Sequence, residues 1–343
     1  AHREGTGLQR PESRGTSLRG ANVSIDRPAD GRGGTGLRIC VFGAGAVGGY
    51  LAARLARAGR HVSLVTRGPH LDAIRSTGLT LRTPAERFTV HPRAAADPGE
   101  LGVQDLVVVT AKTPALAAAA KAMLPLLGPE TPVIFAVNGV FWFYGDGFAP
   151  GGRVPDTRRL DPEGTLHRLI GVERAMGAVI YSPNEVVEPG VVENGRIDDN
   201  RLVIGEPTPG PMSARLTAVV AALDGAGFIV EPAGDIRRAM WLKLIRNVAS
   251  APIACLAGTD MRTALDDPEA RRLAAALMDE TLAVAAADGF SDLSIDPVAE
   301  MGKPRNAHKP SMLQDLEKGR PMEIDTMLRA VQDLARQADV ATP

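Results

Sequence analysis

The chain has 343 residues, of which 44% are hydrophobic, so it is long and apolar enough to form two globular domains rather than one. Its 39 Lys and Arg residues balance 40 Asp and Glu residues, and the formal net charge of -1 offers no basic excess for binding nucleic acid. No stretch reaches the roughly 20 apolar residues of a membrane span. Neither Cys40 nor Cys255 has the spacing of a disulfide framework or a zinc site. We therefore expect a cytoplasmic protein that binds no metal and no membrane.

Residues 1–36 differ in composition from the rest of the chain. They are rich in Gly and Arg, and their few apolar residues follow neither a helical nor a strand period. Such a segment cannot bury enough surface to offset the entropy of ordering, so we expect a disordered leader. The alternative is an arginine-rich targeting segment, which the acidic residues Glu4, Glu12, Asp26 and Asp30 disfavour.

A strand, a glycine-rich turn and a helix follow one another directly after this leader. Residues 37–42 form an apolar strand, residues 43–48 read Gly-Ala-Gly-Ala-Val-Gly, and residues 49–58 have the pattern of a helix. A second strand at residues 61–65 completes a βαβ unit, which is the context that a dinucleotide-binding turn requires. The alternative is a glycine-rich turn that binds no ligand.

Each glycine of this turn has a physical role in the dinucleotide interpretation. Gly43 permits the tight turn, Gly45 lets the backbone approach a pyrophosphate, and Gly48 allows close packing of the helix. The helix N-terminus adds N–H donors and positive potential. The predicted cofactor contacts of the turn are Gly43, Gly45, Ala46, Val47 and Gly48.

The end of the second strand indicates which cofactor is bound. The Asp or Glu that usually selects NAD is absent there, and the sequence reads Thr66-Arg67-Gly68. A carboxylate would repel a 2′-phosphate, whereas Arg67 can pair with it through charge-assisted hydrogen bonds. The sequence therefore favours NADP, with Arg67 as a cofactor ligand; the alternative is a solvated surface arginine.

Further strands and helices continue the alternating order. We expect strands at residues 88–90, 106–109 and 133–137, a helix over 114–127, strands at 174–181, 190–193 and 201–204, a helix over 212–226 and a last strand at 228–230. The Gly-, Pro- and Arg-rich stretch 145–164, which follows the aromatic residues 141–144, is interpreted as an inserted surface loop. The pattern predicts an α/β Rossmann-type domain with a parallel sheet over residues 37–232.

Polar residues follow two of the predicted strands. Lys112 comes after the strand at 106–109, and Asn138 comes after the strand at 133–137. Because ligands bind at the carboxyl ends of strands in an open parallel sheet, both residues are candidate cofactor or substrate contacts. The alternatives are a solvated loop lysine and a turn-forming Asn-Gly pair.

From Asp235 onward the apolar residues recur with a helical period. Helices are expected over residues 235–249, 268–288, 311–318 and 323–339. In the first of these helices Lys243 and Asn247 are four residues apart, so their side chains share one face. The sequence predicts an all-helical domain over residues 233–343.

Three separated stretches resemble the ketopantoate reductase family, in the family's order, over nearly all of residues 37–340. They are the turn at 43–48, the helix Trp241-Leu-Lys-Leu-Ile-Arg-Asn247, and the segment that runs from Ser311 to Asp325. The resemblance implies an N-terminal NADPH domain, a C-terminal helical domain and a cleft between them. There 2-dehydropantoate would be reduced to pantoate, a step of pantothenate and coenzyme A biosynthesis.

The resemblance also implies roles for individual residues. Lys243 matches the family's catalytic lysine and Glu323 its catalytic glutamate. The other matches are substrate contacts at Asn247, Ser311 and Asn138, and cofactor contacts at Lys112, Asn138 and Arg67. The chemistry suits these types, because hydride arriving at a ketone carbon leaves negative charge on oxygen, where a cationic proton donor such as Lys243 stabilises it. The alternative for Lys243 and Glu323 is a surface ion pair.

The chain also departs from the family pattern. The family commonly carries a second asparagine four residues after Asn247, where this chain has Ala251, and often an asparagine where His308 stands. Members usually continue through one more helix beyond the position of Pro343, so we expect the helical domain to lack that helix. A homodimer is compatible with the resemblance.

These departures leave two other functions open. The first is a paralogous NADPH reductase of a different 2-oxo acid or ketone, which Ala251 and the stretch 145–164 motivate. The second is a non-enzymatic NADP-binding protein, which the missing asparagine and the short C-terminus motivate. The presence of both Lys243 and Glu323 argues against the second function, because a binding module has no chemical need for the pair.

Overall fold

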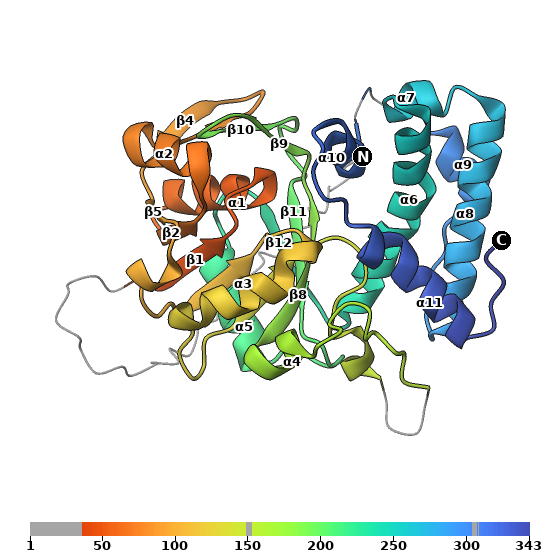
Figure 1. The fold of residues 1–343 in the computed structure, drawn as a ribbon, viewed down its shortest axis with the longest axis horizontal. Coiled ribbons are helices and arrows are strands. Elements are labelled where there is room, and N and C mark those ends of the chain that lie inside the picture. Colours follow the sequence, from red (N-terminus) through yellow and green to blue (C-terminus); the bar gives the residue numbers. More distant parts are fainter. Residues whose placement is uncertain (1–35, 149–152, 304–306, 308) are drawn as a thin grey trace, which may run out of the picture. The chain divides into compact units, whose positions relative to one another are not determined.

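A computed structural model describes residues 36–148, 153–303, 307 and 309–343, and residues 36–343 form one compact unit (Figure 1). The predicted leader lies outside the described residues except for Gly36, and so does His308. The described chain is an α/β part followed by a helical part, so the predicted fold class is confirmed. The last strand ends at Ala233 and the next helix begins at Ile236, close to the predicted domain boundary after residue 232. The division into two domains at this point stays a prediction.

A large sheet runs through the α/β part. Its strands are β1 (Arg38–Phe42), β2 (His61–Val65), β5 (Arg93–Ala95), β6 (Leu106–Val109), β7 (Val133–Ala136), β8 (Ala175–Tyr181), β11 (Arg201–Gly205) and β12 (Ile229–Ala233), in the order β12-β11-β8-β7-β6-β1-β2-β5. All neighbours are parallel except β8 and β11. Strands β6 and β7 are wholly buried, as expected for apolar runs that are covered on both faces.

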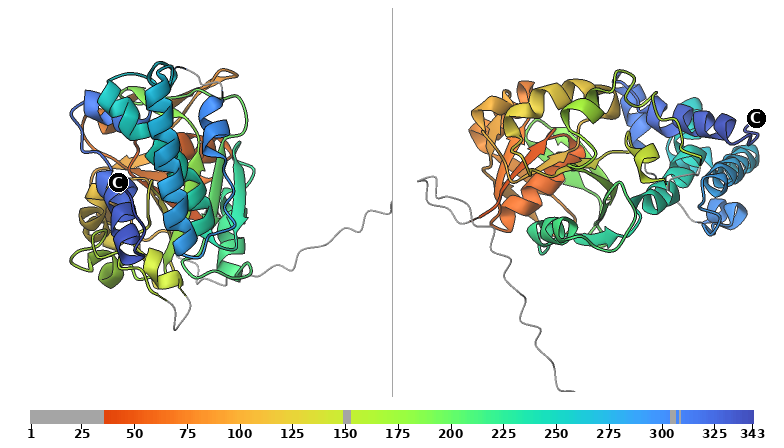
Figure 2. Two further views of the ribbon diagram at one scale, coloured as in Figure 1. Left: turned by 90° about the vertical axis from the view of Figure 1, so that its right-hand side faces the viewer. Right: turned by 90° about the horizontal axis from the view of Figure 1, so that it is seen from below.

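Helices cover both faces of this sheet. They are α1 (Ala46–Arg57), α2 (Gly68–Thr77), α3 (Leu116–Met123), α4 (Thr165–Leu169) and α5 (Ala214–Leu223), with short 3-10 turns η1 (Pro98–Glu100), η2 (Thr113–Ala115), η3 (Leu124–Leu126) and η4 (Tyr144–Gly147). Figure 2, seen from below, shows yellow α3 and green α5 on opposite faces. Alternate residues of β1 serve the two faces: Ile39 and Val41 pack with α1 and α5, whereas Cys40 and Phe42 pack with α3.

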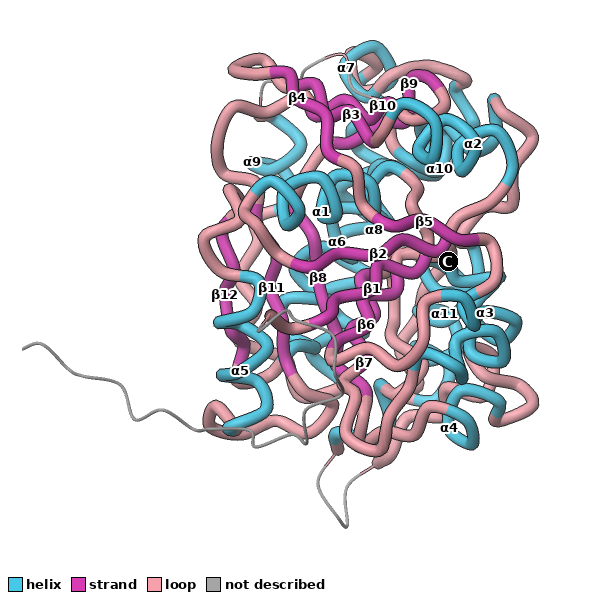
Figure 3. Tube along the Cα trace, turned by 90° about the vertical axis from the view of Figure 1, so that its left-hand side faces the viewer, coloured by secondary structure: helices cyan, strands magenta, loops and turns pink. Residues whose placement is uncertain are grey.

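A second, smaller sheet packs on α1 and was not predicted as a sheet. It consists of β4 (Arg87–Val90), β3 (Leu79–Arg82), β10 (Val191–Asn194) and β9 (Asn184–Glu188), in that order (Figure 3). Strands close to β4 and β10 were expected, but β3 and β9 were missed, and so was β5 of the large sheet. They are short strands with polar residues among the apolar ones, and such runs give a weak periodic signal.

The helical part contains α6 (Ile236–Ala257), α7 (Met261–Ala264), α8 (Pro268–Ala287), α9 (Pro297–Gly302), α10 (Ser311–Glu317), the π-helix η5 (Asp325–Arg329) and α11 (Ala330–Gln337). The predicted end of the first helix at Ala249 is wrong, because α6 continues through Pro252. A proline inside a helix removes one hydrogen bond, and burial of Ala251, Ile253 and Ala254 keeps the last turns helical. None of the helices in the described ranges combines the length and apolarity needed to cross a bilayer.

Candidate active site

The predicted site residues of the α/β part gather at one edge of the large sheet. Strand β1 lies between β2 and β6, so the strand order reverses at this point, and Ala44, Gly45 and Thr66, just beyond β1 and β2, line a crevice. Gly43 follows β1 and Thr66 follows β2, while Lys112 and Asn138 lie just beyond β6 and β7. The polar residues and glycines that follow the predicted strands therefore indicated this edge of the sheet correctly.

The glycine turn has the shape that a dinucleotide phosphate requires. Gly43 has a φ of 104°, and a Cβ there would lie 2.9 Å from the backbone nitrogen of Ala111. A Cβ on Gly48 would collide with the carbonyl of Gly43, whereas a Cβ on Gly45 would meet no atom within 4 Å. Helix α1 begins at Ala46 and has no acidic residue in its first turn. The open space at Gly45 and the donors of the helix N-terminus fit a bound pyrophosphate.

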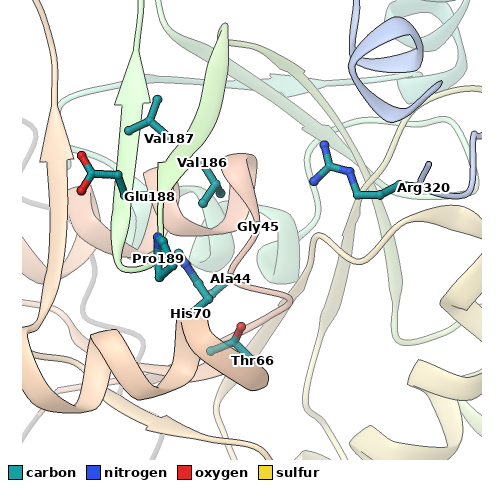
Figure 4. Close-up of a pocket in the computed structure, with 9 residues that line it drawn as sticks. All are labelled: Ala44, Gly45, Thr66, His70, Val186, Val187, Glu188, Pro189 and Arg320. Atoms are coloured by element: carbon teal, nitrogen blue, oxygen red, sulfur yellow. The ribbon is translucent and has the colours of Figure 1, made fainter. Parts of the chain in front are cut away.

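A pocket of about 330 Å³ lies against this turn (Figure 4). Its wall includes Gly45, Thr66 and His70 of the α/β part, Glu188 of β9 and Arg320 of the helical part. The Nδ1 atom of His70 accepts a hydrogen bond of 3.0 Å from the Gly190 backbone, which ties α2 to the turn between β9 and β10. Burial lowers the pKa of His70. Arg320 was not predicted as a site residue.

Arg67 occupies the N-cap position of α2, directly after Thr66, and is exposed. Within the described residues, its side chain takes part in no hydrogen bond or ion pair. Its place beyond the carboxyl end of β2 is where the ribose of a dinucleotide lies in this fold class. The role of Arg67 stays a prediction.

A chain of hydrogen bonds joins Lys243, Asn138 and Glu323. The Nζ atom of Lys243 donates to Oδ1 of Asn138 over 2.9 Å and to the Ile180 carbonyl at the end of β8 over 2.6 Å. The Nδ2 atom of Asn138 donates to Oε2 of Glu323 over 3.1 Å. The other carboxylate oxygen of Glu323 accepts from the Thr113 backbone over 3.1 Å. One network of hydrogen bonds therefore connects the edge of the sheet to the helical part.

The backbone after Asn138 explains how Glu323 comes so close. A Cβ on Gly139 would collide with the backbone of Thr326, and the Val140 nitrogen donates to the Thr326 carbonyl over 2.9 Å. Glu323 itself is buried, and Asn138 stands between it and Lys243. The surface ion pair considered as an alternative is thus wrong, because no direct ion pair between Lys243 and Glu323 occurs in the described part of the chain.

The environment of Lys243 shifts its protonation. Burial of the ammonium group lowers the pKa of Lys243 from 10.5 to about 8, and the charge of Glu323 partly opposes this shift. The ring of Tyr181 lies beside the group, with its centroid 5.8 Å from Nζ. A lysine with this pKa is still protonated at neutral pH but releases its proton more readily than an exposed lysine.

Lys112 pairs with a carboxylate that the sequence analysis missed. Its ammonium forms an ion pair with Asp315 of α10, whose side chain is buried and also pairs with Arg320 over 3.2 Å. Asp315 and Arg320 both stand in the third family-like stretch, which is the one signal that could have drawn attention to them.

The remaining predicted substrate contacts, Asn247 and Ser311, do not belong to the hydrogen-bonded network that the described residues form around Lys243. Asn247 is partly buried on α6, one turn beyond Lys243, and Ser311 is exposed at the start of α10. Neither side chain forms a hydrogen bond to another described residue. Ala251 is 3% exposed and lies in the hydrophobic core.

The aromatic residues 141–144 belong to the hydrophobic core. Phe141, Trp142, Phe143 and Tyr144 are each at most 2% exposed. The hydroxyl of Tyr144 accepts a hydrogen bond from Nε1 of Trp241 and donates one to Asp288, each over 2.9 Å. Tyr144 therefore connects the α/β part to α6 and to the end of α8.

A doubly covered parallel sheet, a glycine turn at its switch point and a lysine beside the same edge define an NAD(P)-dependent oxidoreductase with a Rossmann-type domain. The family model described as "Ketopantoate reductase PanE/ApbA" matches residues 39–141, and the model described as "Ketopantoate reductase PanE/ApbA C terminal" matches residues 235–343. The chain belongs to the ketopantoate reductase family, so the predicted resemblance is confirmed.

Individual relatives agree with this assignment. The chain is 41% identical over 315 residues to the 2-dehydropantoate 2-reductase of Mesorhizobium japonicum, with 90% of this chain and 94% of that relative covered. The structure of 2-dehydropantoate 2-reductase from Geobacter metallireducens superposes with a TM-score of 0.76 at 28% identity, covering 89% of this chain and 95% of that one. D-mandelate dehydrogenase with NADH gives a TM-score of 0.72 at 19% identity over 90% and 94%, which shows the fold alone.

Proposed function

We propose that the chain is a cytoplasmic enzyme that reduces 2-dehydropantoate to pantoate with NADPH, in pantothenate and coenzyme A biosynthesis. The observation that carries the proposal is the network of Lys243, Asn138 and Glu323 at the carboxyl edge of the sheet, beside the glycine turn. The named activity of the Mesorhizobium relative supports the choice of substrate.

The residues at the crevice fit the cofactor. The turn from Gly43 to Gly48 would hold the pyrophosphate, because Gly45 leaves open space in front of the helix N-terminus. Arg67 would pair with the 2′-phosphate. Lys112 and Asn138 would lie near the nicotinamide. When bound, NADPH supplies the hydride that the keto carbon accepts.

Lys243 would act as the proton donor. As the keto carbon gains hydride, its oxygen becomes an alkoxide, and the ammonium of Lys243 stabilises that charge and transfers one proton to the oxygen. The lowered pKa suits this transfer, because a donor works best when its pKa is near the working pH. The alcohol is then complete, and Lys243 regains its proton from solvent.

Asn138 and Glu323 would orient the donor. Asn138 accepts from Nζ of Lys243 and donates to Glu323, so its amide cannot turn over without losing both hydrogen bonds. Glu323 holds the amide and would contact the product alcohol or the cofactor. Asn247 and Ser311 would bind the substrate's hydroxyl or carboxylate. The homodimer stays a prediction.

One observation favours a second candidate function, the paralogous reductase of another 2-oxo acid. Ala251 takes the place of a family asparagine and is packed in the core, so the described site lacks an amide there. A hydrogen-bonding site that loses one donor discriminates less well among substrates. The non-enzymatic alternative is weakened, because Lys243 has a lowered pKa and lies in a hydrogen-bonded network.

Oxidation of NADPH measured with 2-dehydropantoate and a panel of small 2-oxo acids tests the proposal. We expect 2-dehydropantoate to have the highest kcat/KM of the panel. A higher value for another acid would establish the paralogue instead. Tight NADPH binding without turnover of any acid would favour the non-enzymatic protein.

A further inference from the structure

One buried carboxylate, Asp315, holds two cations at the border between the α/β part and the helical part. It forms an ion pair with Lys112, beyond β6, and its Oδ1 atom lies 3.2 Å from Nε of Arg320. A buried carboxylate requires such compensation, because desolvation of an unpaired charge is costly. Two cations on one carboxylate leave one positive charge in excess beside the crevice.

The end of α10 fixes the position of Arg320. Gly319 has a φ of 59°, and its backbone nitrogen donates to the Leu316 carbonyl over 3.1 Å. The Arg320 nitrogen donates to the Asp315 carbonyl over 2.8 Å. These two bonds form a Schellman motif, which returns the chain so that Arg320 lies beside Asp315. Backbone and side chain therefore both tie Arg320 to the same residue.

From this position the Arg320 side chain reaches the pocket at the glycine turn. Figure 4 shows its guanidinium extending toward the pocket from the side opposite to Val187 and Glu188, with His70 and Thr66 below. Within the described residues, Asp315 is its one carboxylate partner. The side chain is 47% exposed, so the rest of the guanidinium remains accessible to a ligand.

The charges around this pocket favour an anion. The N-terminus of α1 and the open space at Gly45 form one wall, and Arg320 forms the other. Glu188 also lines the pocket, but it pairs with Arg82 over 3.2 Å and points away from Arg320 in Figure 4. Burial lowers the pKa of His70 and so disfavours its charged form. An anion between Gly45 and Arg320 would accept hydrogen bonds from the N-terminus of α1 on one side and from the guanidinium on the other.

We propose that Arg320 binds the diphosphate of the nicotinamide cofactor from the side of the helical part, and that Asp315 positions it. The inference rests on the proposed cofactor. Arg320 is the contacting residue, and Asp315 is a positioning residue that connects it to Lys112. The segment after α10 thereby becomes part of the nucleotide site.

Direct binding of three ligands to the full chain tests this assignment by calorimetry. NADPH carries both the diphosphate and the 2′-phosphate, ADP-ribose carries the diphosphate, and adenosine 2′-monophosphate carries the 2′-phosphate without the diphosphate. Arg320→Ala should weaken NADPH and ADP-ribose by about ten- to a hundred-fold, the range for a lost charge-assisted hydrogen bond, and leave adenosine 2′-monophosphate unchanged. Unchanged affinity for ADP-ribose would overturn the proposal.

Three further variants sharpen the test. Asp315→Asn keeps the size of the side chain and should give the same ligand pattern as Arg320→Ala, which a merely structural role would not produce. Lys318→Ala, on the same segment but paired with Glu185 and outside the pocket, should change no affinity. Arg67→Ala should weaken NADPH and adenosine 2′-monophosphate but not ADP-ribose. Equal weakening of all three ligands by Arg320→Ala would show a folding role and refute the assignment.

The same measurements separate this inference from the catalytic proposal. If the unmodified chain binds NADPH and ADP-ribose but reduces no 2-oxo acid, the catalytic proposal fails, and the response of ADP-ribose to Arg320→Ala still decides the inference. If the unmodified chain binds neither ligand, both proposals are wrong.

Discussion

Lys243 of α6 donates a hydrogen bond of 2.9 Å to the Asn138 amide oxygen at the end of β7. The two residues are 105 positions apart in the chain and come from its helical and α/β parts. Their contact places a cationic side chain at the same sheet edge as the glycine turn. It also gives Asn138 a structural task that its position after a strand did not reveal.

Asn138→Ala is expected to lower kcat while NADPH still binds. The variant removes the acceptor for Lys243 and the donor for Glu323, and hydrogen bonds to charged groups contribute roughly 1.5 to 3 kcal/mol, which corresponds to about one to two decades in rate. Steady-state kinetics and NADPH affinity should be measured on the same preparation. Wild-type kcat in this variant would show that the network does not orient Lys243.

The pH dependence of activity and of stability should have opposite signs. A proton donor must carry its proton, so kcat/KM for the keto acid should fall as the pH rises through about 8, the pKa of Lys243. For stability, the unfolded lysine keeps its ordinary pKa of 10.5 and binds more protons than the folded one between these two values. The contribution of Lys243 to the free energy of unfolding therefore increases with pH over this window.

Lys243→Met is the control for this pH experiment, because it keeps a long side chain without a titrating group. Both the fall in kcat/KM and the rise in stability that Lys243 causes between pH 8 and 10.5 should occur in the parent and be absent from the variant. A flat kcat/KM profile for the parent protein across the window would contradict the proton-donor role.

The first βαβ unit could be predicted because its signals are local. The buried strand, the glycine turn and the helix start are consecutive, and each gives a pattern within a few residues. The small sheet could not be predicted, because β3 pairs with β10, which lies more than a hundred residues later in the chain. In addition, neither strand is long or uniformly apolar. The last turns of α6 were missed because Pro252 contradicts local helix preference, and tertiary packing overrides it.

The candidate site was only partly accessible from the sequence. Lys243, Asn138 and Glu323 were each named from their context, but the hydrogen bonds among them span 105 and 185 residues, and no spacing rule connects such positions. Asp315 and Arg320 were missed for the same reason, because the ion pair with Lys112 exists only in the folded chain. The burial of the aromatic residues 141–144 was not predicted, since burial of four consecutive residues depends on which elements pack around them.

Tyr144→Phe should destabilise the protein by about 1 to 3 kcal/mol, because the buried partners Trp241 and Asp288 each lose a hydrogen bond. The hydroxyl lies between the α/β part and the helical part, so its loss loosens the packing that places α6. Denaturant unfolding measures the effect. Tyr181→Phe is the matched control, since its hydroxyl makes one long bond of 3.5 Å among the described residues and should cost less. Equal stability of both variants would contradict this reading of the Tyr144 contacts.

Arg67→Ala should reduce the preference for NADPH over NADH. Loss of a charge-assisted contact to the 2′-phosphate weakens NADPH by about one to two decades and leaves NADH, which lacks that phosphate, unaffected. Affinities for both cofactors are compared in parent and variant. If the parent protein binds both cofactors equally well, the assignment of Arg67 is wrong. The exposed Arg60, which binds the Asp224 carbonyl away from the pocket, provides the control substitution Arg60→Ala.

Lys243→Ala should lower turnover by about two to four decades, the range for a lost general acid, while NADPH binding persists. Binding and chemistry separate because Lys243 lies on α6, whereas the glycine turn and Arg67 belong to the α/β part. Lys243→Arg should rescue little, since a guanidinium keeps the charge but releases its proton far less readily and needs more room beside Asn138 and the Ile180 carbonyl. Turnover, NADPH affinity and unfolding are measured on both variants. Near-normal turnover in Lys243→Ala would eliminate the proposed mechanism, and a parallel loss of NADPH binding and stability would assign Lys243 to folding instead.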